Sequence, residues 1–208
     1  FTPKLIAYSQ ASPTACKDTF ILSSKVRIIG PTAEFRMDTA QVCDTGSVEF
    51  YNFTSPLNAT FKFDYGDGTT PSVNKMPPRK YVFNGGSKDD SVLFFPTIVA
   101  TSFGCDAFFT DTIVVYRSPV PAFKLDTNRG CKPLTVNLFN ESEFTDKIEW
   151  DFFNDGVIDS VDMDTVSWEI DKVGRYGVGL YTQRGACKAS LLLDSLIGVS
   201  KAPLPFYT

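Results

Sequence analysis

The sequence predicts an all-β chain of two β-sandwiches in tandem, and three observations support this fold class. Short runs of alternating apolar and polar residues recur along the 208 residues, separated by turns rich in Gly, Pro and Asp. No stretch combines helix caps with an apolar period of 3.6 residues. Several features of the first half also recur in the second half at a domain-sized offset, which is typical of tandem units.

The composition suits folded domains and argues against several classes of partner. Hydrophobic residues make up 43% of the chain and aromatic residues 14%, which is enough for substantial cores. The formal net charge is −4 and no dense Lys/Arg cluster occurs, so we expect no nucleic-acid partner. No apolar run approaches the roughly 20 residues that span a bilayer, so we expect no direct membrane insertion.

The residue types also argue against catalysis. The chain has no His, which removes the Ser-His and Cys-His nucleophile pairs and the commonest metal-binding side chain. No two carboxylates stand out as an acid–base pair. We therefore expect that the protein is not an enzyme.

The repeat divides the chain into units. Sliding the sequence along itself by 88 positions places Cys43 on Cys131, and Cys105 and Cys187 stand near the ends of the two units. The same shift places 30–35 on 118–123 and 48–52 on 136–140. The expected organisation is the last strands of a preceding unit at 1–29, complete units at 30–117 and 118–200, and the start of a next unit or a linker at 201–208.

Strands are expected throughout each complete unit. In the first unit, 81–83 and 92–100 are expected strands, and Pro96 marks an edge or a bulge because proline cannot donate to a ladder. The polar stretch 85–90 is expected to be a solvated hairpin tip. The strands expected in the second unit are 122–125, 135–139, 147–153, one or two within 161–170, 175–181 and 189–199.

The most informative stretch is 148–159, which begins as a strand and ends in a turn. Trp150 and Phe152 lie on one face of the expected strand, and we expect Trp150 in the sandwich core. Asp155-Gly156 predicts a tight turn, and Asp151 is expected to bind the turn amides. A degenerate copy of this signature in the first unit consists of Phe63, Asp64, Asp67 and Gly68.

Several motifs of the second unit occur together in one known family. They are Pro121-Ala-Phe123, Gly130-Cys-Lys-Pro-Leu-Thr-Val136, Trp150-Asp-Phe152 with Asp155-Gly156, Gly174-Arg-Tyr-Gly-Val-Gly-Leu180 and Gly185-Ala-Cys187. With these motifs the chain resembles tandem PKD domains, which implies an immunoglobulin-like β-sandwich for each unit. In the first unit Phe63 replaces the family's Trp, and no Pro-Leu-Thr follows Cys43.

This variety of motif resembles the PKD repeats of large secreted and cell-surface proteins of Bacteroidota, including gliding-motility adhesins. The resemblance implies a structural or adhesive repeat segment that acts as a semi-rigid spacer and presents binding surfaces. The expected partners are neighbouring repeats of the same chain and a surface glycan or another cell-surface protein. The alternative is a carbohydrate- or protein-binding accessory module of a secreted hydrolase.

The five cysteines lead to an expectation about disulfides and compartment. Because each unit has one cysteine before its second strand and one near its closing hairpin, we expect the pairs Cys43–Cys105 and Cys131–Cys187. Cys16 matches the closing type, so its partner is expected outside the chain. Paired cysteines imply an oxidising, extracellular or cell-surface location. The alternative is five reduced thiols in a cytosolic protein.

Other residues have a functional interpretation beside a structural one. Asp151, Asn154, Asp155 and Asp159 are candidate Ca²⁺ ligands or, alternatively, a structural turn; no other cofactor is expected. The aromatic residues Phe152, Phe153 and Trp168 could form an exposed binding surface or be buried. Asp-Ser/Thr-apolar motifs resemble O-glycosylation sites of Bacteroidota at Thr39, Thr112, Thr165 and Ser195.

Overall fold

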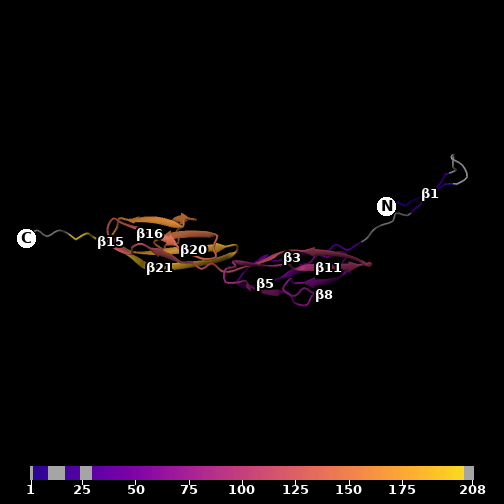
Figure 1. Ribbon diagram of the computed structural model, residues 1–208, viewed down its shortest axis with the longest axis horizontal. Coiled ribbons are helices and arrows are strands. Elements are labelled where there is room, and N and C mark those ends of the chain that lie inside the picture. Colours follow the sequence, from indigo (N-terminus) through magenta and orange to yellow (C-terminus); the bar gives the residue numbers. More distant parts are fainter. Residues whose placement is uncertain (1, 9–16, 24–29, 204–208) are drawn as a thin grey trace, which may run out of the picture.

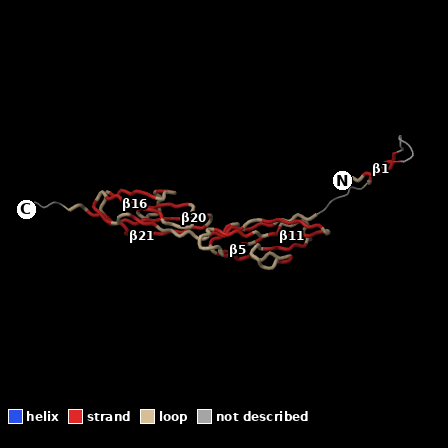
Figure 2. Tube along the Cα trace, viewed as in Figure 1, coloured by secondary structure: helices blue, strands red, loops and turns tan. Residues whose placement is uncertain are grey.

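A computed structural model describes residues 2–8, 17–23 and 30–203. The described residues contain strands and no helix, and two β-sandwiches lie end to end (Figures 1 and 2). An antiparallel hairpin of β1 (Lys4–Tyr8) and β2 (Lys17–Ile21) forms a separate two-stranded sheet. Cys16 and the strand expected at 26–29 lie outside the described residues.

The second sandwich consists of two sheets. One sheet has the strand order β14-β16-β19 and the other has the order β15-β21-β20-β17-β18. Neighbouring strands are antiparallel, except that β15 runs parallel to β21. The strands are β14 (Phe123–Leu125), β15 (Arg129–Cys131), β16 (Leu134–Asn140), β17 (Lys147–Phe152), β18 (Ser160–Val161), β19 (Thr165–Ile170), β20 (Gly174–Arg184) and β21 (Cys187–Ser200).

The first sandwich repeats this plan with shorter strands. Pairs β3-β6 and β5-β9 form one face, and the orders β12-β11-β7-β8 and β10-β13-β4 form the other. Strand β4 runs parallel to β13, as β15 does to β21. The strands are β3 (Phe35–Met37), β4 (Gln41–Cys43), β5 (Thr45–Val48), β6 (Phe50–Asn52), β7 (Thr60–Asp64), β8 (Ser72–Val73), β9 (Arg79–Val82), β10 (Ser91–Phe94), β11 (Thr97–Ser102), β12 (Cys105–Thr110) and β13 (Ile113–Tyr116).

The closing hairpin differs between the two sandwiches. In the second it is the continuous pair β20–β21, whereas in the first it is divided into β11–β12 and β10–β13. Pro96 lies at this division, where its carbonyl oxygen accepts a 3.1 Å hydrogen bond from the Asp111 N–H. Because proline has no N–H for the ladder, it interrupts the hairpin as expected.

Each sandwich has its own hydrophobic core. Trp150 is fully buried in the second core, where its Nε1–H donates a 2.9 Å hydrogen bond to the Met163 carbonyl. In the first core Phe63 occupies the corresponding strand position and packs edge-on against Phe35 and Tyr65. Trp150 likewise meets Phe123 edge-on with ring centroids 5.5 Å apart, so aromatic rings pack around this strand position in both cores.

Tyr81 gives the first core a pH-dependent contribution to stability. Its buried hydroxyl donates a 2.8 Å hydrogen bond to the Tyr65 carbonyl, and burial, followed by the nearby Asp67 charge, raises the pKa of Tyr81 well above 10. A raised phenol pKa in the folded state leaves stability intact below pH 10 and lowers it as the pH rises further. We expect the first sandwich to lose stability between pH 10 and 12 by chemical denaturation, and Tyr81→Phe to reduce that slope. An unchanged slope in the variant would contradict this role.

Candidate functional site at the joint between the sandwiches

The Asp151 signature forms a structural turn. The Asp151 side chain is fully buried, and its two carboxylate oxygens accept hydrogen bonds from the Asp155 N–H at 3.0 Å and the Gly156 N–H at 2.8 Å. Gly156 has φ of 87°, a conformation that glycine adopts freely. In the degenerate copy, Asp64 accepts a hydrogen bond from the Gly66 N–H, and Asp67 binds Thr69 and Arg79.

The other candidate Ca²⁺ ligands serve the same turn and its neighbours. Asp159 accepts a hydrogen bond from the Phe152 N–H at 2.6 Å, and the Asn154 amide donates to Asp194 at 2.6 Å. Asp155 accepts from the Val157 N–H. Within the described part of the chain, no three Asp, Glu, Cys or His side chains are grouped so that they could hold a metal ion. These side chains therefore form hydrogen bonds within a structural turn and with its neighbours.

The aromatic residues around this turn are mostly buried against one another. Trp168 is 8% exposed, stacks on Phe152 with ring centroids 4.8 Å apart, and meets Phe153 and Tyr176 edge-on. Only Phe153 of the three candidates is substantially exposed. The structure therefore places Trp168 in the packing beside the turn and not on a flat binding platform.

The motifs that resemble O-glycosylation sites lie at or near the surface. Thr165 and Ser195 are exposed, whereas Thr39 and Thr112 are partly buried. The Thr39 hydroxyl also donates a 2.9 Å hydrogen bond to the Gln41 carbonyl.

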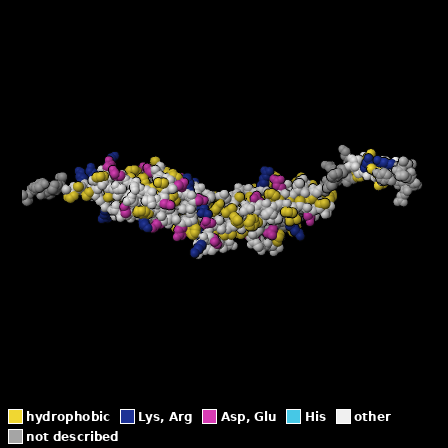
Figure 3. All heavy atoms as spheres, turned by 45° about the horizontal axis from the view of Figure 1, so that its top comes forward, with side chains coloured by type: hydrophobic (Ala, Val, Ile, Leu, Met, Phe, Trp, Pro, Cys, Tyr) yellow, Lys and Arg dark blue, Asp and Glu magenta, His cyan; other side chains and the backbone are white. Residues whose placement is uncertain are grey.

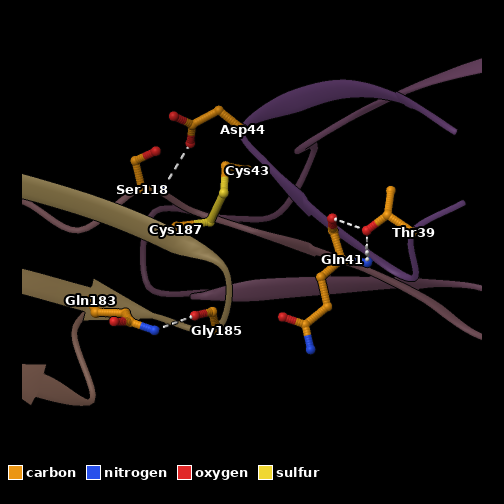
Figure 4. Close-up of a disulfide and its surroundings, with 8 residues drawn as sticks. All are labelled: Thr39, Gln41, Cys43, Asp44, Ser118, Gln183, Gly185 and Cys187. Carbon is orange, nitrogen blue, oxygen red and sulfur yellow. Dashed lines mark hydrogen bonds between the residues drawn. A yellow bond between two sulfur atoms is a disulfide. The ribbon is translucent and has the colours of Figure 1, made fainter.

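The disulfide connects the two sandwiches. Cys43, the last residue of β4, is bonded to Cys187, the first residue of β21, with Cα atoms 5.5 Å apart (Figure 4). Cys105 and Cys131 are unbonded and exposed. The expected pairs Cys43–Cys105 and Cys131–Cys187 are therefore wrong. Cys43 and Cys187 do form a disulfide, but with each other.

Strand geometry explains why the expected pairs cannot form. Cys131 lies beside Ser200 at one end of β21, and Cys187 is at the other end of that 14-residue strand. At about 3.3 Å per residue, the two cysteines are about 40 Å apart. Cys43 lies beside Tyr116, and Cys105 is similarly far away along the closing hairpin of its own sandwich. A disulfide needs Cα atoms within about 7 Å.

Polar contacts hold the segment that connects the sandwiches. The Ser118 N–H donates a 2.9 Å hydrogen bond to Asp44, next to the disulfide (Figure 4). The Arg117 guanidinium donates to the carbonyls of Gly86 and Ser87 at 2.7 and 2.8 Å. It also lies over Phe83 of the first sandwich and Phe144 of the second, with ring centroids 4.8 and 4.4 Å away. Arg117 thus bridges both units by cation–π contacts.

A second set of contacts comes from the hairpin between β20 and β21. Arg184 forms an ion pair with Asp90 of the first sandwich at 2.6 Å. Gly185 packs against Tyr116, so that a Cβ atom at this position would lie 2.5 Å from the Tyr116 ring. The polar stretch 85–90, expected to be only a solvated tip, therefore supplies acceptors to the joint.

Gly185 offers a direct test of this packing. We expect Gly185→Ala to shift the equilibrium of the Cys43–Cys187 disulfide toward the dithiol by about tenfold or more in a glutathione redox buffer, because the added methyl overlaps the Tyr116 ring. Gly104→Ala is the matched control, since Gly104 also has a positive φ in a closing hairpin but has no heavy atom within 4 Å of the added Cβ. Equal shifts in both variants would show that backbone strain and not the joint is responsible.

The outer face of the sheet β12-β11-β7-β8 carries an exposed row of three apolar residues and one lysine. Phe108, Val99, Lys62 and Val73 are successive cross-strand neighbours, and Phe108 is 79% exposed. Figure 3 shows apolar side chains among interspersed acidic and basic ones along the visible face of both units. This row offers an exposed surface for an apolar contact.

The polar groups of the joint connect the two sandwiches. The Arg117 guanidinium and the Ser118 N–H are engaged in hydrogen bonds, and Arg184 forms an ion pair with Asp90, while the Nε atom of Arg184 is buried without a hydrogen-bond partner. The described residues also include no helix long and apolar enough to cross a membrane.

Comparisons with known proteins identify the fold. No protein-family model matches the sequence, and no curated protein matches it either. Among solved structures, extracellular domains 3–5 of Drosophila OTK are similar over 91% of this chain and 68% of that chain, with 14% identity and a TM-score of 0.53. Murine CEACAM1b is similar over 82% of this chain and 100% of that chain, with 14% identity and a TM-score of 0.49. The chain is all-β with an immunoglobulin-like fold.

Proposed function

We propose that this protein is a non-catalytic segment of an extracellular or cell-surface protein, in which tandem units act as a semi-rigid spacer that presents binding surfaces. The units are of the PKD type, and the parent protein is an adhesin of the kind that acts in bacterial surface adhesion and gliding motility. The boundaries are those of the repeat, with units at 30–117 and 118–200.

The disulfide-linked joint is the observation that carries the spacer function in this proposal. A disulfide, an ion pair and a cation–π contact connect the two sandwiches. Together they restrict the motion of one sandwich relative to the other. Pro119 is buried in the connection, and Pro121 follows it, which further limits the backbone. The disulfide also supports an oxidising, extracellular compartment.

Small-angle X-ray scattering of the oxidised chain tests the spacer function. We expect an elongated particle whose maximum dimension stays constant between low and high salt, because the joint is covalent and largely packed. A compact particle with the sandwiches folded side by side, or a broad distribution of shapes, would contradict the proposal.

The adhesive part of the proposal rests on the exposed row at Phe108. Beads coated with the protein should lose attachment to cells of the producing kind when Phe108 is replaced by serine. Leu57→Ser is the matched control, because Leu57 is fully exposed in the turn before β7 and is not one of the residues of the row. Equal attachment of both variants would remove the row from the binding function.

A further inference from the structure

Two exposed cysteines occupy the same positions in the fold as the two that form the joint. Cys131 is the last residue of β15 and pairs in parallel with Ser200, as Cys43 is the last residue of β4 and pairs in parallel with Tyr116. Cys105 is the first residue of β12, as Cys187 is the first residue of β21. Each unit thus has one cysteine of each kind, at opposite ends of its sandwich.

The backbone around the two edge-strand cysteines is also the same. The Asp44 N–H donates to the Tyr116 carbonyl at 2.8 Å, and the Lys132 N–H donates to the Ser200 carbonyl at 3.0 Å. The chain then leaves the two sandwiches with similar residues. Arg117-Ser-Pro-Val-Pro121 follows Tyr116, and Lys201-Ala-Pro-Leu-Pro205 follows Ser200. The residues after Ser200 therefore resemble in sequence the linker that follows Tyr116.

An open hollow lies beside Cys131, where the second sandwich has nothing packed on it within the described residues. Its volume is about 440 Å³, and its lining includes Gly130, Val173 and Ser200. In the strand register, Ser200 corresponds to Tyr116 and Val173 to Ser91, next to the acceptor Asp90. At the joint, this region of the first sandwich receives the hairpin that carries Arg184, Gly185 and Cys187.

We propose that Cys131 and Cys105 are half-cystines of two further joints of the same construction, an inference that rests on the tandem array proposed above. The partner of Cys131 is the cysteine that begins the last hairpin strand of a following sandwich. The partner of Cys105 is the cysteine that ends the parallel edge strand of a preceding sandwich. Every joint is then closed by one disulfide between neighbouring units, and no disulfide lies within a unit.

Thiol–disulfide exchange forms each bond with a low-molecular-weight disulfide, such as oxidised glutathione, as the oxidant. The Cys131 thiolate attacks one sulfur of the oxidant and releases one thiol, which leaves a mixed disulfide on Cys131. The neighbour's thiolate then attacks the Cys131 sulfur, forms the joint disulfide and releases the second thiol. Two protein thiols are oxidised, and one disulfide of the oxidant is reduced to two thiols.

The test is a disulfide map of the protein isolated from the cells that produce it. Free thiols are blocked with N-ethylmaleimide before lysis, and the protein is digested without reduction and analysed by mass spectrometry. The Cys43–Cys187 peptide pair serves as the internal control for preserved oxidation. We expect Cys105 and Cys131 to carry no N-ethylmaleimide, because their thiols are already in disulfides. We also expect Cys131 linked to a cysteine of the Cys187 kind and Cys105 linked to one of the Cys43 kind.

Two results would overturn the inference. One is recovery of Cys105 and Cys131 as N-ethylmaleimide adducts while Cys43–Cys187 is intact. The other is a bond between cysteines of one kind, such as Cys131 to Cys131 of a second copy. Neither result would change the scattering of the chain itself, so failure of this inference is distinguishable from failure of the proposed spacer function.

Discussion

Replacing Cys43 with serine is expected to destabilise the protein by up to about 5 kcal/mol, because the bond closes a loop with a sequence separation of 144. When the second sandwich unfolds, the linker holds one end of its chain and the disulfide holds the other at Cys187, so the bond lowers the entropy of the unfolded state. The same variant should broaden the distribution of angles between the sandwiches. Chemical denaturation measures the first effect, and scattering measures the second.

Cys131→Ser is the control for this prediction, since Cys131 is exposed and unbonded in the described structure. It should leave both the stability and the scattering of the chain unchanged. If Cys43→Ser behaved in the same way as Cys131→Ser, the noncovalent contacts of Arg117 and Arg184 would be sufficient to hold the joint.

Replacing Asp151 with asparagine is expected to lower the unfolding free energy of the second sandwich by about 3 kcal/mol or more. The amide keeps one acceptor oxygen but points an NH₂ group at one of the two turn N–H groups, and it loses the stronger bonds to a carboxylate. Tryptophan fluorescence reports this sandwich alone, because both Trp residues of the chain, Trp150 and Trp168, belong to it.

Asp155→Asn is the matched control in the same turn. Asp155 is exposed and accepts one hydrogen bond, from the Val157 N–H, so its replacement should change the unfolding free energy by less than about 1 kcal/mol. Equal effects of the two substitutions would mean that the buried carboxylate is not what holds the turn.

Much of the fold could be predicted because its signals are local. Alternating residues mark β16, β17 and β19, and the turn after Trp150 has its own residue types. Strands β4 and β15 could not be found in this way, because each has three residues and no alternation long enough to detect. Their structure depends on parallel pairing with strands far along the chain.

The error in the disulfide pairing follows from those missed strands. The repeat correctly identifies two kinds of cysteine, but their spacing in the sequence does not say which end of a sandwich each kind occupies. Once β4 and β15 are placed beside the ends of β13 and β21, the two kinds lie at opposite ends. The joint residues Arg117 and Arg184 were likewise beyond prediction, because their partners come from the other unit.

The position of the disulfide changes how the protein would respond to tension. A pull applied at the two ends of the sandwich pair passes from Cys43 directly to Cys187, and everything between them in the sequence lies in a side loop. Fully stretched, that loop would add on the order of 500 Å of length. Because the disulfide bypasses this loop, the loop does not lengthen under tension. The mechanical load then acts only on β3 and β4, which lead up to Cys43, and on β21, which begins at Cys187. The pair would therefore behave as an inextensible tether, whose reach stays the same even if most of its strands unfold.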